Sequence, residues 1–145
     1  MFKYILKLTA SIGAAILLSS TPGNAQVVKS VDVTIPFAFQ VSDKSFAAGD
    51  YMIGQPSSQS SNRTISIRRK DGKYSGMLQL LPPAAGERSH ADATSLVFRR
   101  YGTVFMLSEV RLRIIDLTGR LRRSETESSL ARRFGEPEMR IVRGQ

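Results

Sequence analysis

The sequence predicts an all-β fold with one C-terminal helix, in which about six antiparallel strands form a small barrel or a sandwich. Three observations lead to this fold class. Residues 31–41 carry a large apolar side chain at every odd position, which is the period of a strand with one buried face. Shorter alternating runs follow, separated by turn residues, and a helix-capping sequence comes near the end of the chain. Barrel and sandwich would give the same patterns, so both architectures stay open.

Residues 1–25 have the three parts of a secretory signal. A basic start is followed by an uncharged apolar run over residues 8–18 and by small residues at the cleavage position. That run is too short for a membrane span, which needs about 20 apolar residues. We expect cleavage near Ala25/Gln26 and export of residues 26–145 as a single periplasmic or secreted domain. No later stretch is apolar enough for a transmembrane segment in the mature chain.

The first predicted strand is the most regular, with six apolar residues in one phase: Val31, Val33, Ile35, Phe37, Phe39 and Val41. Pro36 lies in the opposite phase and cannot donate a ladder hydrogen bond, so we expect a sheet edge or a bulge there. Residues 51–54 form a second, short strand. Residues 63–69 and 74–81 should form a hairpin, because an Asp-Gly pair between alternating runs is a strong hairpin signal.

Two longer strands are predicted next, over residues 95–101 and 103–115, with a turn at Gly102. We expect one face of the second strand, interrupted by a serine, to be formed by Val104, Met106, Val110, Leu112 and Ile114. The opposite face begins apolar at Phe105 and Leu107 and then becomes charged. Another element must therefore cover these two side chains.

A helix over about residues 123–134 is the expected cover. A Ser-Glu-Thr-Glu capping box begins it, and a glycine followed shortly by a proline ends it. Leu130 and Phe134 form a narrow apolar stripe, which should pack on the side of Phe105 and Leu107. The charged tail that follows the helix is expected to be mobile.

Several segments resemble a set of small exported bacterial proteins. The similarity lies in D-V-T-I-P-F-A-F-Q-V (32–41), A-A-G-D-Y (47–51), L-V-F-R-R-Y-G (96–102), F-M-L-S-E-V (105–110) and E-S-S-L-A-R-R (127–133). In that family the second segment typically reads L-P-A-G-x-Y, and here Phe46 and Ala47 replace its leucine and proline. The resemblance covers most of the mature chain and implies an exported β-rich domain. It implies no activity, since the family has no catalytic residues to transfer.

The chain is strongly basic, and the excess charge is carried by arginine. The net charge of +9 falls to +7 without the two lysines of the signal, and residues 88–145 contain twelve arginines, no lysine and seven acids. Arginine suits planar, bidentate contacts to phosphate or carboxylate groups. The candidate anion-binding residues are Arg99, Arg100, Arg111 and Arg113. The alternative is that these arginines cover strands and pair with local carboxylates.

Residue types favour a role without catalysis, without a metal and without a cofactor. The chain has no cysteine and one histidine, His90, which lies in a polar loop without a nucleophile motif. These counts leave too few ligands for a His/Cys metal site, and no phosphate-binding glycine loop is present. Glu109 is the best single acid, but glycoside cleavage needs a second carboxylate across a cleft. The alternative for Glu109 is an ion pair with a neighbouring arginine.

We therefore expect an exported, non-enzymatic binding or structural module. Its arginine-rich face would contact an anionic polysaccharide, a lipid headgroup or an envelope protein. Two alternatives stay open, namely an enzyme with a carboxylate site near Glu109 and a carrier of a small apolar ligand inside a barrel. Export disfavours cellular nucleic acid as a partner.

Overall fold

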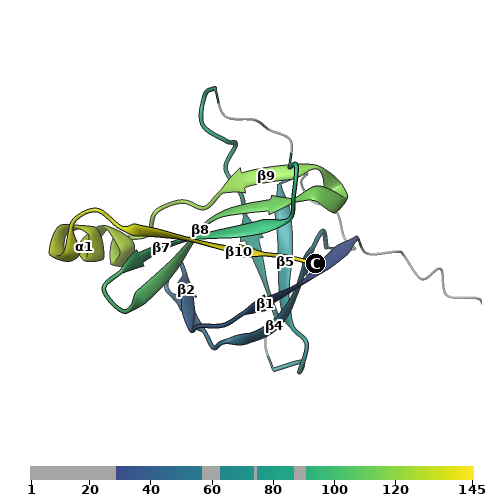
Figure 1. The fold of residues 1–145 in the computed structure, drawn as a ribbon, viewed down its shortest axis with the longest axis horizontal. Coiled ribbons are helices and arrows are strands. Elements are labelled where there is room, and N and C mark those ends of the chain that lie inside the picture. Colours follow the sequence, from purple (N-terminus) through teal and green to yellow (C-terminus); the bar gives the residue numbers. More distant parts are fainter. Residues whose placement is uncertain (1–28, 57–62, 74, 87–90) are drawn as a thin grey trace, which may run out of the picture.

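The computed structural model describes residues 29–56, 63–73, 75–86 and 91–145 (Figure 1). Within these ranges, two β-sheets face each other as a sandwich, with one α-helix near the C-terminus. The all-β fold with a C-terminal helix is confirmed, and the choice between barrel and sandwich falls on the sandwich. The expected signal over residues 1–25 and the loop histidine His90 lie outside the described residues.

The first sheet, sheet A, has four antiparallel strands in the order β1-β4-β5-β6. Its members are β1 (Ser30–Ile35), β4 (Gly49–Gly54), β5 (Thr64–Arg69) and β6 (Ser75–Gln79). The predicted Asp-Gly hairpin is confirmed as β5 and β6, with Ile65 and Ile67 fully buried. Gly72 in its turn has φ +74°, a value that side-chain-bearing residues resist.

The second sheet, sheet B, has six strands in the order β10-β7-β8-β2-β3, with β9 pairing beside β2 along the long strand β8. Its strands are β2 (Phe39–Val41), β3 (Lys44–Phe46), β7 (Ser95–Tyr101), β8 (Val104–Leu112), β9 (Leu117–Arg120) and β10 (Glu138–Arg143). β2 pairs with β8 in parallel through Gln40 and Met106, whereas the other described pairings are antiparallel. The 3-10 helix η1 (Arg113–Ile115) and the helix α1 (Glu125–Phe134) complete the fold.

Residues 31–41 form two strands in two different sheets, not the single strand that their alternation predicts. β1 ends at Ile35 in sheet A, and β2 begins at Phe39 in sheet B. Pro36 lies between them and is exposed, because a residue without an N–H cannot continue the ladder with β4. The inward phase is nevertheless kept across the break: five of the six apolar residues are buried and Phe37 is partly buried. The odd-numbered residues of both strands point inward because the two sheets share one core between them.

Aromatic side chains fill the space between the sheets. Phe37 stacks on Phe105 with ring centroids 4.0 Å apart and meets the edge of Phe98 at 5.1 Å. Phe39 meets Phe46 and Tyr51 at 4.9 and 5.5 Å. Phe37 thus provides the cover that the sequence demanded for Phe105.

A β-bulge at Ser108 changes which residues of β8 face the core: odd-numbered residues do so before the bulge and even-numbered residues after it. Val97 pairs with Glu109 and Phe98 pairs with Leu107, which leaves Ser108 as the extra residue. Its hydroxyl donates to the carbonyl oxygen of Val97 at 2.9 Å. The predicted common face is therefore wrong: Phe105, Leu107, Val110 and Leu112 face the core between the sheets, Met106 faces outward, and Ile114 leaves the strand for η1.

The helix forms where predicted but covers the other face of sheet B. Ser124 is its N-cap and accepts from the N–H of Glu127 at 3.1 Å, and Gly135 ends it with φ +79°. Glu127 contacts the outward-facing Tyr101, so α1 does not pack on Phe105 and Leu107 as expected. Phe134 is 46% exposed and lies against Gly102 at the turn between β7 and β8.

The charged tail forms β10 along the edge of sheet B, instead of the mobile segment expected. Its register with β7 runs from Glu138 opposite Arg100 to Arg143 opposite Ser95. Beyond the strand, the N–H of Gln145 donates to the carbonyl oxygen of β1 residue Asp32 at 3.2 Å, so the two sheets meet at this end. Among the described residues, no helix is both long and apolar enough to cross a membrane.

Candidate anion-binding site

Two of the four candidate arginines, Arg99 and Arg100, lie at the α1 end of sheet B and are both paired with carboxylates. The guanidinium of Arg99 contacts Glu127 at 2.9 Å. Arg100 contacts Glu138 at 3.2 Å and donates to the carbonyl oxygen of Gly102 at 2.8 Å. Their positive charges are thus compensated within the protein.

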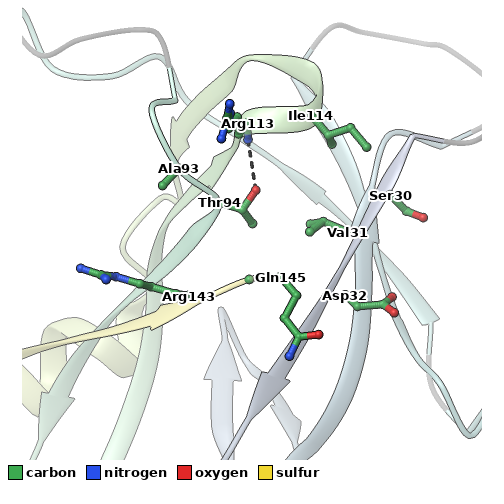
Figure 2. Close-up of a pocket in the computed structure, with 10 residues that line it drawn as sticks. Ser30, Val31, Asp32, Ala93, Thr94, Arg113, Ile114, Arg143 and Gln145 are labelled. Carbon is green, nitrogen blue, oxygen red and sulfur yellow. Dashed lines mark hydrogen bonds between the residues drawn. The ribbon is translucent and has the colours of Figure 1, made fainter.

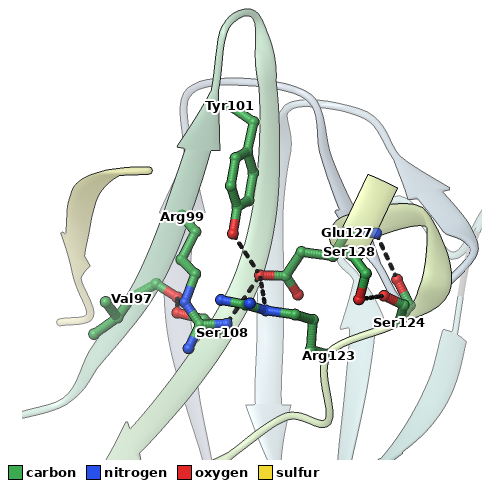
Figure 3. A network of polar contacts seen from close by, with 8 residues as sticks. All are labelled: Val97, Arg99, Tyr101, Ser108, Arg123, Ser124, Glu127 and Ser128. Carbon is green, nitrogen blue, oxygen red and sulfur yellow. Dashed lines mark hydrogen bonds and ion pairs between the residues drawn. The ribbon is translucent and has the colours of Figure 1, made fainter. Parts of the chain in front are cut away.

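Glu127 is the centre of this end, and Figure 3 shows three side chains converging on its carboxylate. Its Oε1 accepts from the hydroxyl of Tyr101 at 3.1 Å and from Arg99, and Arg123 lies at 3.7 Å. The Glu127 side chain is 4% exposed. The capping sequence revealed the backbone role of Glu127, but its contacts with β7 depend on tertiary packing and gave no sequence signal.

Burial raises the pKa of the Tyr101 hydroxyl above its ordinary value, and the negative charge of Glu127 and its hydrogen bond raise it further. The neutral phenol is the form that can donate to a carboxylate. Tyr101 therefore acts as a fixed donor that holds α1 against sheet B. These contacts describe a structural network, because the carboxylate is enclosed by its own partners.

The other two candidates, Arg111 and Arg113, lie toward the opposite end of sheet B. Arg111 contacts Glu109 at 2.6 Å, which favours the structural interpretation of this acid. Arg113 begins η1, and its N–H donates to the hydroxyl of Thr94 at 3.3 Å. Within the described ranges, no carboxylate lies within ion-pair distance of the Arg113 guanidinium.

Arg143 of β10 joins this second end, although sequence reasoning missed it. It lies opposite Ser95, which in turn lies opposite Arg111, so the three residues form one row across the outer face. Neighbouring strands are about 4.8 Å apart, which puts the Cα atoms of Arg143 and Arg111 about 10 Å apart. Arg143 also has no carboxylate partner in the part of the chain that the structure describes. Only recognition of residues 138–143 as a strand could have placed it here.

Arg113 and Arg143 line the same open cleft, which has a volume of about 710 Å³. Segments of β1, of the chain before β7, of η1 and of the chain after β10 meet around it. Figure 2 shows both arginines on the sheet-B side with Thr94 between them, and the β1 residue Val31 on the other side. The exposed side chain of Ile114 adds a second apolar surface.

The one acid that lines the cleft is already compensated. Asp32 contacts the ammonium group of Lys70 at 2.6 Å, and the hydrogen bond to Asp32, together with the charge of Asp32, raises the pKa of that lysine. The uncompensated side-chain charge at the cleft is therefore positive. Two guanidinium groups offer several N–H donors in planar arrays, a geometry that fits the oxygens of carboxylate, sulfate or phosphate groups.

The described residues do not group the ligands that a metal ion needs. No set of three or more His, Cys, Asp or Glu side chains lies close enough together in these ranges to hold a metal ion.

Comparison with protein-family models, with curated proteins and with solved structures found no match to this chain.

Proposed function

We propose that the protein is an exported, non-enzymatic binding module that holds an anionic group of an envelope or extracellular partner at the cleft between Arg113 and Arg143. A polysaccharide, a lipid headgroup or an envelope protein could present such a group. One observation carries the proposal: these two arginines line one cleft and, within the described residues, have no carboxylate partner. Of the four arginines that the sequence singles out, Arg113 is the one that lines this cleft, and the proposed site adds Arg143 to it.

The surroundings of the two arginines support an anionic ligand over a neutral one. Asp32 is compensated by Lys70, so it adds little repulsion toward an incoming anion. The hydroxyl of Thr94 lies between the two arginines in Figure 2 and can donate to an oxygen of the ligand. Val31 and Ile114 would contact an apolar part of the same ligand.

The two alternatives receive less support from the geometry. Glu109 is engaged by Arg111 at 2.6 Å, and it is not among the residues that line the cleft. An apolar carrier would need space between the sheets, where Phe37 contacts both Phe98 and Phe105. The recognition of an anion therefore remains the function that the described residues support best.

Retention on an anionic matrix tests this proposal. Residues 26–145 carrying both R113Q and R143Q should elute from a sulfated-polysaccharide column at clearly lower salt than the parent. The matched control carries R122Q and R132Q, which remove the same charge from exposed positions near α1. Equal shifts for both pairs would mean that net charge alone drives retention, and no shift for the first pair would contradict the site.

The source of the anion is resolved by the choice of probe. The parent and the R113Q/R143Q variant are titrated with a sulfated polysaccharide, with a uronic-acid polysaccharide and with vesicles that contain phosphatidylglycerol. The class that loses affinity selectively in this variant, but not in the R122Q/R132Q control, is the ligand class. Unfolding curves for all variants ensure that a loss of binding is not a loss of fold.

A further inference from the structure

The edge strands of the sandwich are not equally protected. Among the described strands, β3 is only three residues long, β1 ends at Ile35 before Pro36, and β6 is followed by a bridge from Leu81 to Arg120 of β9. β10 has six residues and pairs with β7 on one side only. In Figure 1 it runs across the near side of the molecule from α1 to the C-terminus. An exposed strand edge is a template for pairing with another strand.

Hydrogen bonds after β10 identify which backbone groups point to the free edge. The N–H of Gly144 donates to the carbonyl oxygen of Thr94, so even-numbered residues bond toward β7. The N–H of Gln145 points the other way, to Asp32. By the same alternation, the N–H and C=O groups of Met139 and Ile141 point away from β7.

The same two residues expose apolar side chains. Met139 is 53% exposed and Ile141 is 61% exposed. They lie opposite Arg99 and Val97 and so share the outer face of sheet B. The free edge of β10 thus combines backbone N–H and C=O groups that point away from β7 with exposed apolar side chains. After the end of the strand, this edge is already bonded to β1, because the N–H of Gln145 donates to the carbonyl oxygen of Asp32.

We propose that β10 pairs with β10 of a second copy of this chain, in antiparallel orientation about a two-fold axis at Arg140. This register places Met139 opposite Ile141 of the second copy, and Ile141 opposite its Met139. Each pair would exchange both of its N–H···O bonds, and the four apolar side chains would cover one another on the outer face. In this arrangement the outer face of sheet B in one copy continues into the outer face of sheet B in the other.

The charges of β10 match those of a second copy. Arg140 contacts Glu138 of its own chain at 3.3 Å. Each Glu138 also contacts Arg100 of its own chain. In the proposed register Glu138 lies diagonally from Arg140 of the second copy, so the two glutamates offset the repulsion between the two Arg140 side chains, which lie opposite each other. Pro137 has no N–H and ends the pairing at the next outward position. A short pairing of this kind should give a weak, concentration-dependent dimer.

Cysteine cross-linking tests the register, because the chain has no cysteine of its own. Arg140 would lie opposite itself in a non-hydrogen-bonded pair with Cα atoms about 4.5 Å apart, a separation that a disulfide can span. R140C should therefore give a disulfide-linked dimer under mild oxidation. The matched control is M77C, a 65% exposed residue on another edge strand, which should stay monomeric. Equal cross-linking of both variants, or cross-linking of I141C in place of R140C, would overturn the pairing.

Sedimentation of the cysteine-free chain provides the second measurement. The fraction of dimer should rise with protein concentration for residues 26–145 and for M77K, and should be lost in I141K because a lysine would face an apolar partner. A monomer at every concentration overturns the proposal. A monomer that binds anionic vesicles through Met139 and Ile141 would assign this edge to a lipid surface, which also overturns it.

Discussion

The two ends of the outer face of sheet B use arginine in opposite ways. At the α1 end, Arg99 is held at 2.9 Å by a buried glutamate of the helix. At the cleft end, Arg113 and Arg143 have no carboxylate partner within the described residues. Strands β7 and β10 reach both ends, so the sheet itself does not cause the difference.

What differs is the element laid over the sheet. α1 brings Glu127 to Arg99 and Tyr101 and removes the carboxylate from solvent. Among the described residues, no α-helix lies over the cleft end, and the acid nearby is compensated by Lys70 of sheet A. The same residue type therefore fastens an element at one end and has no carboxylate partner among the described residues at the other. Four substitutions should separate these two roles.

The largest effect is expected at Glu127. E127A should lower the free energy of unfolding by about 3 kcal/mol, because it leaves Arg99 and Tyr101 without their partner in a buried position. Urea denaturation measures this. E125A, in the exposed first turn of the same helix, should cost under about 1 kcal/mol. Equal losses in the two variants would show that the helix needs acidic residues only for its dipole.

Arg99 should have the next largest effect. R99Q should cost about 2 kcal/mol, since a partly buried charge pair loses one member while Tyr101 still satisfies the carboxylate. The double variant E127A/R99Q should cost less than the sum of the single losses. Additive losses would mean that the two residues act independently.

Tyr101 contributes a single hydrogen bond to the same network. Y101F should cost about 1 kcal/mol at neutral pH, measured by urea denaturation. A cost near zero would mean that the bond to Glu127 adds nothing beyond the packing of the ring.

The pH dependence of stability gives Tyr101 a second readout. Its pKa is raised in the folded state above the ordinary value of 10.0, chiefly by burial. The folded state then holds the proton more tightly, so this contribution is complete below pH about 10 and is lost as the pH rises through the folded pKa. Y101F should therefore flatten the fall of the unfolding free energy in alkali. An unchanged slope above pH about 10 would contradict this assignment.

The smallest change in stability is expected at the cleft end. R143Q should alter the free energy of unfolding by no more than about 0.5 kcal/mol, because Arg143 is exposed and has no carboxylate partner in the described chain. Its effect should appear in retention on the anionic matrix instead. A stability loss as large as that of R99Q would end the contrast between the two ends.

Much of the fold could be predicted because its signals are local. Alternation at residues 31–41 gave the inward phase of Val31 and Phe39, and the Asp-Gly pair gave the β5–β6 hairpin. The capping serine and Gly135 gave the bounds of α1 to within two residues. Which residues of β8 face the core could not be predicted in the same way. One bulge at Ser108 moves every later residue of the strand to the opposite face from the one that simple alternation predicts.

The candidate site was predicted less well than the fold, since arginine content does not reveal partners. Arg99, Arg100 and Arg111 each meet a carboxylate, and for Arg99 and Arg100 that acid lies far along the chain. Arg113 lines the cleft of the proposed site, but Arg143 belongs to a tail that was expected to be mobile. Edge strands in charged tails carry a weak hydrophobic pattern, so their pairing is not visible from composition.

The sequence by itself determined which side chains alternate, where the helix is capped and how much positive charge the second half carries, because these properties depend on neighbours along the chain. Tertiary structure alone decided that residues 31–41 divide between two sheets and that Glu127 meets Arg99 while Arg143 meets no acid among the described residues. Strand register and sheet packing bring together residues that are distant in sequence, and no local pattern specifies which charge lies opposite which.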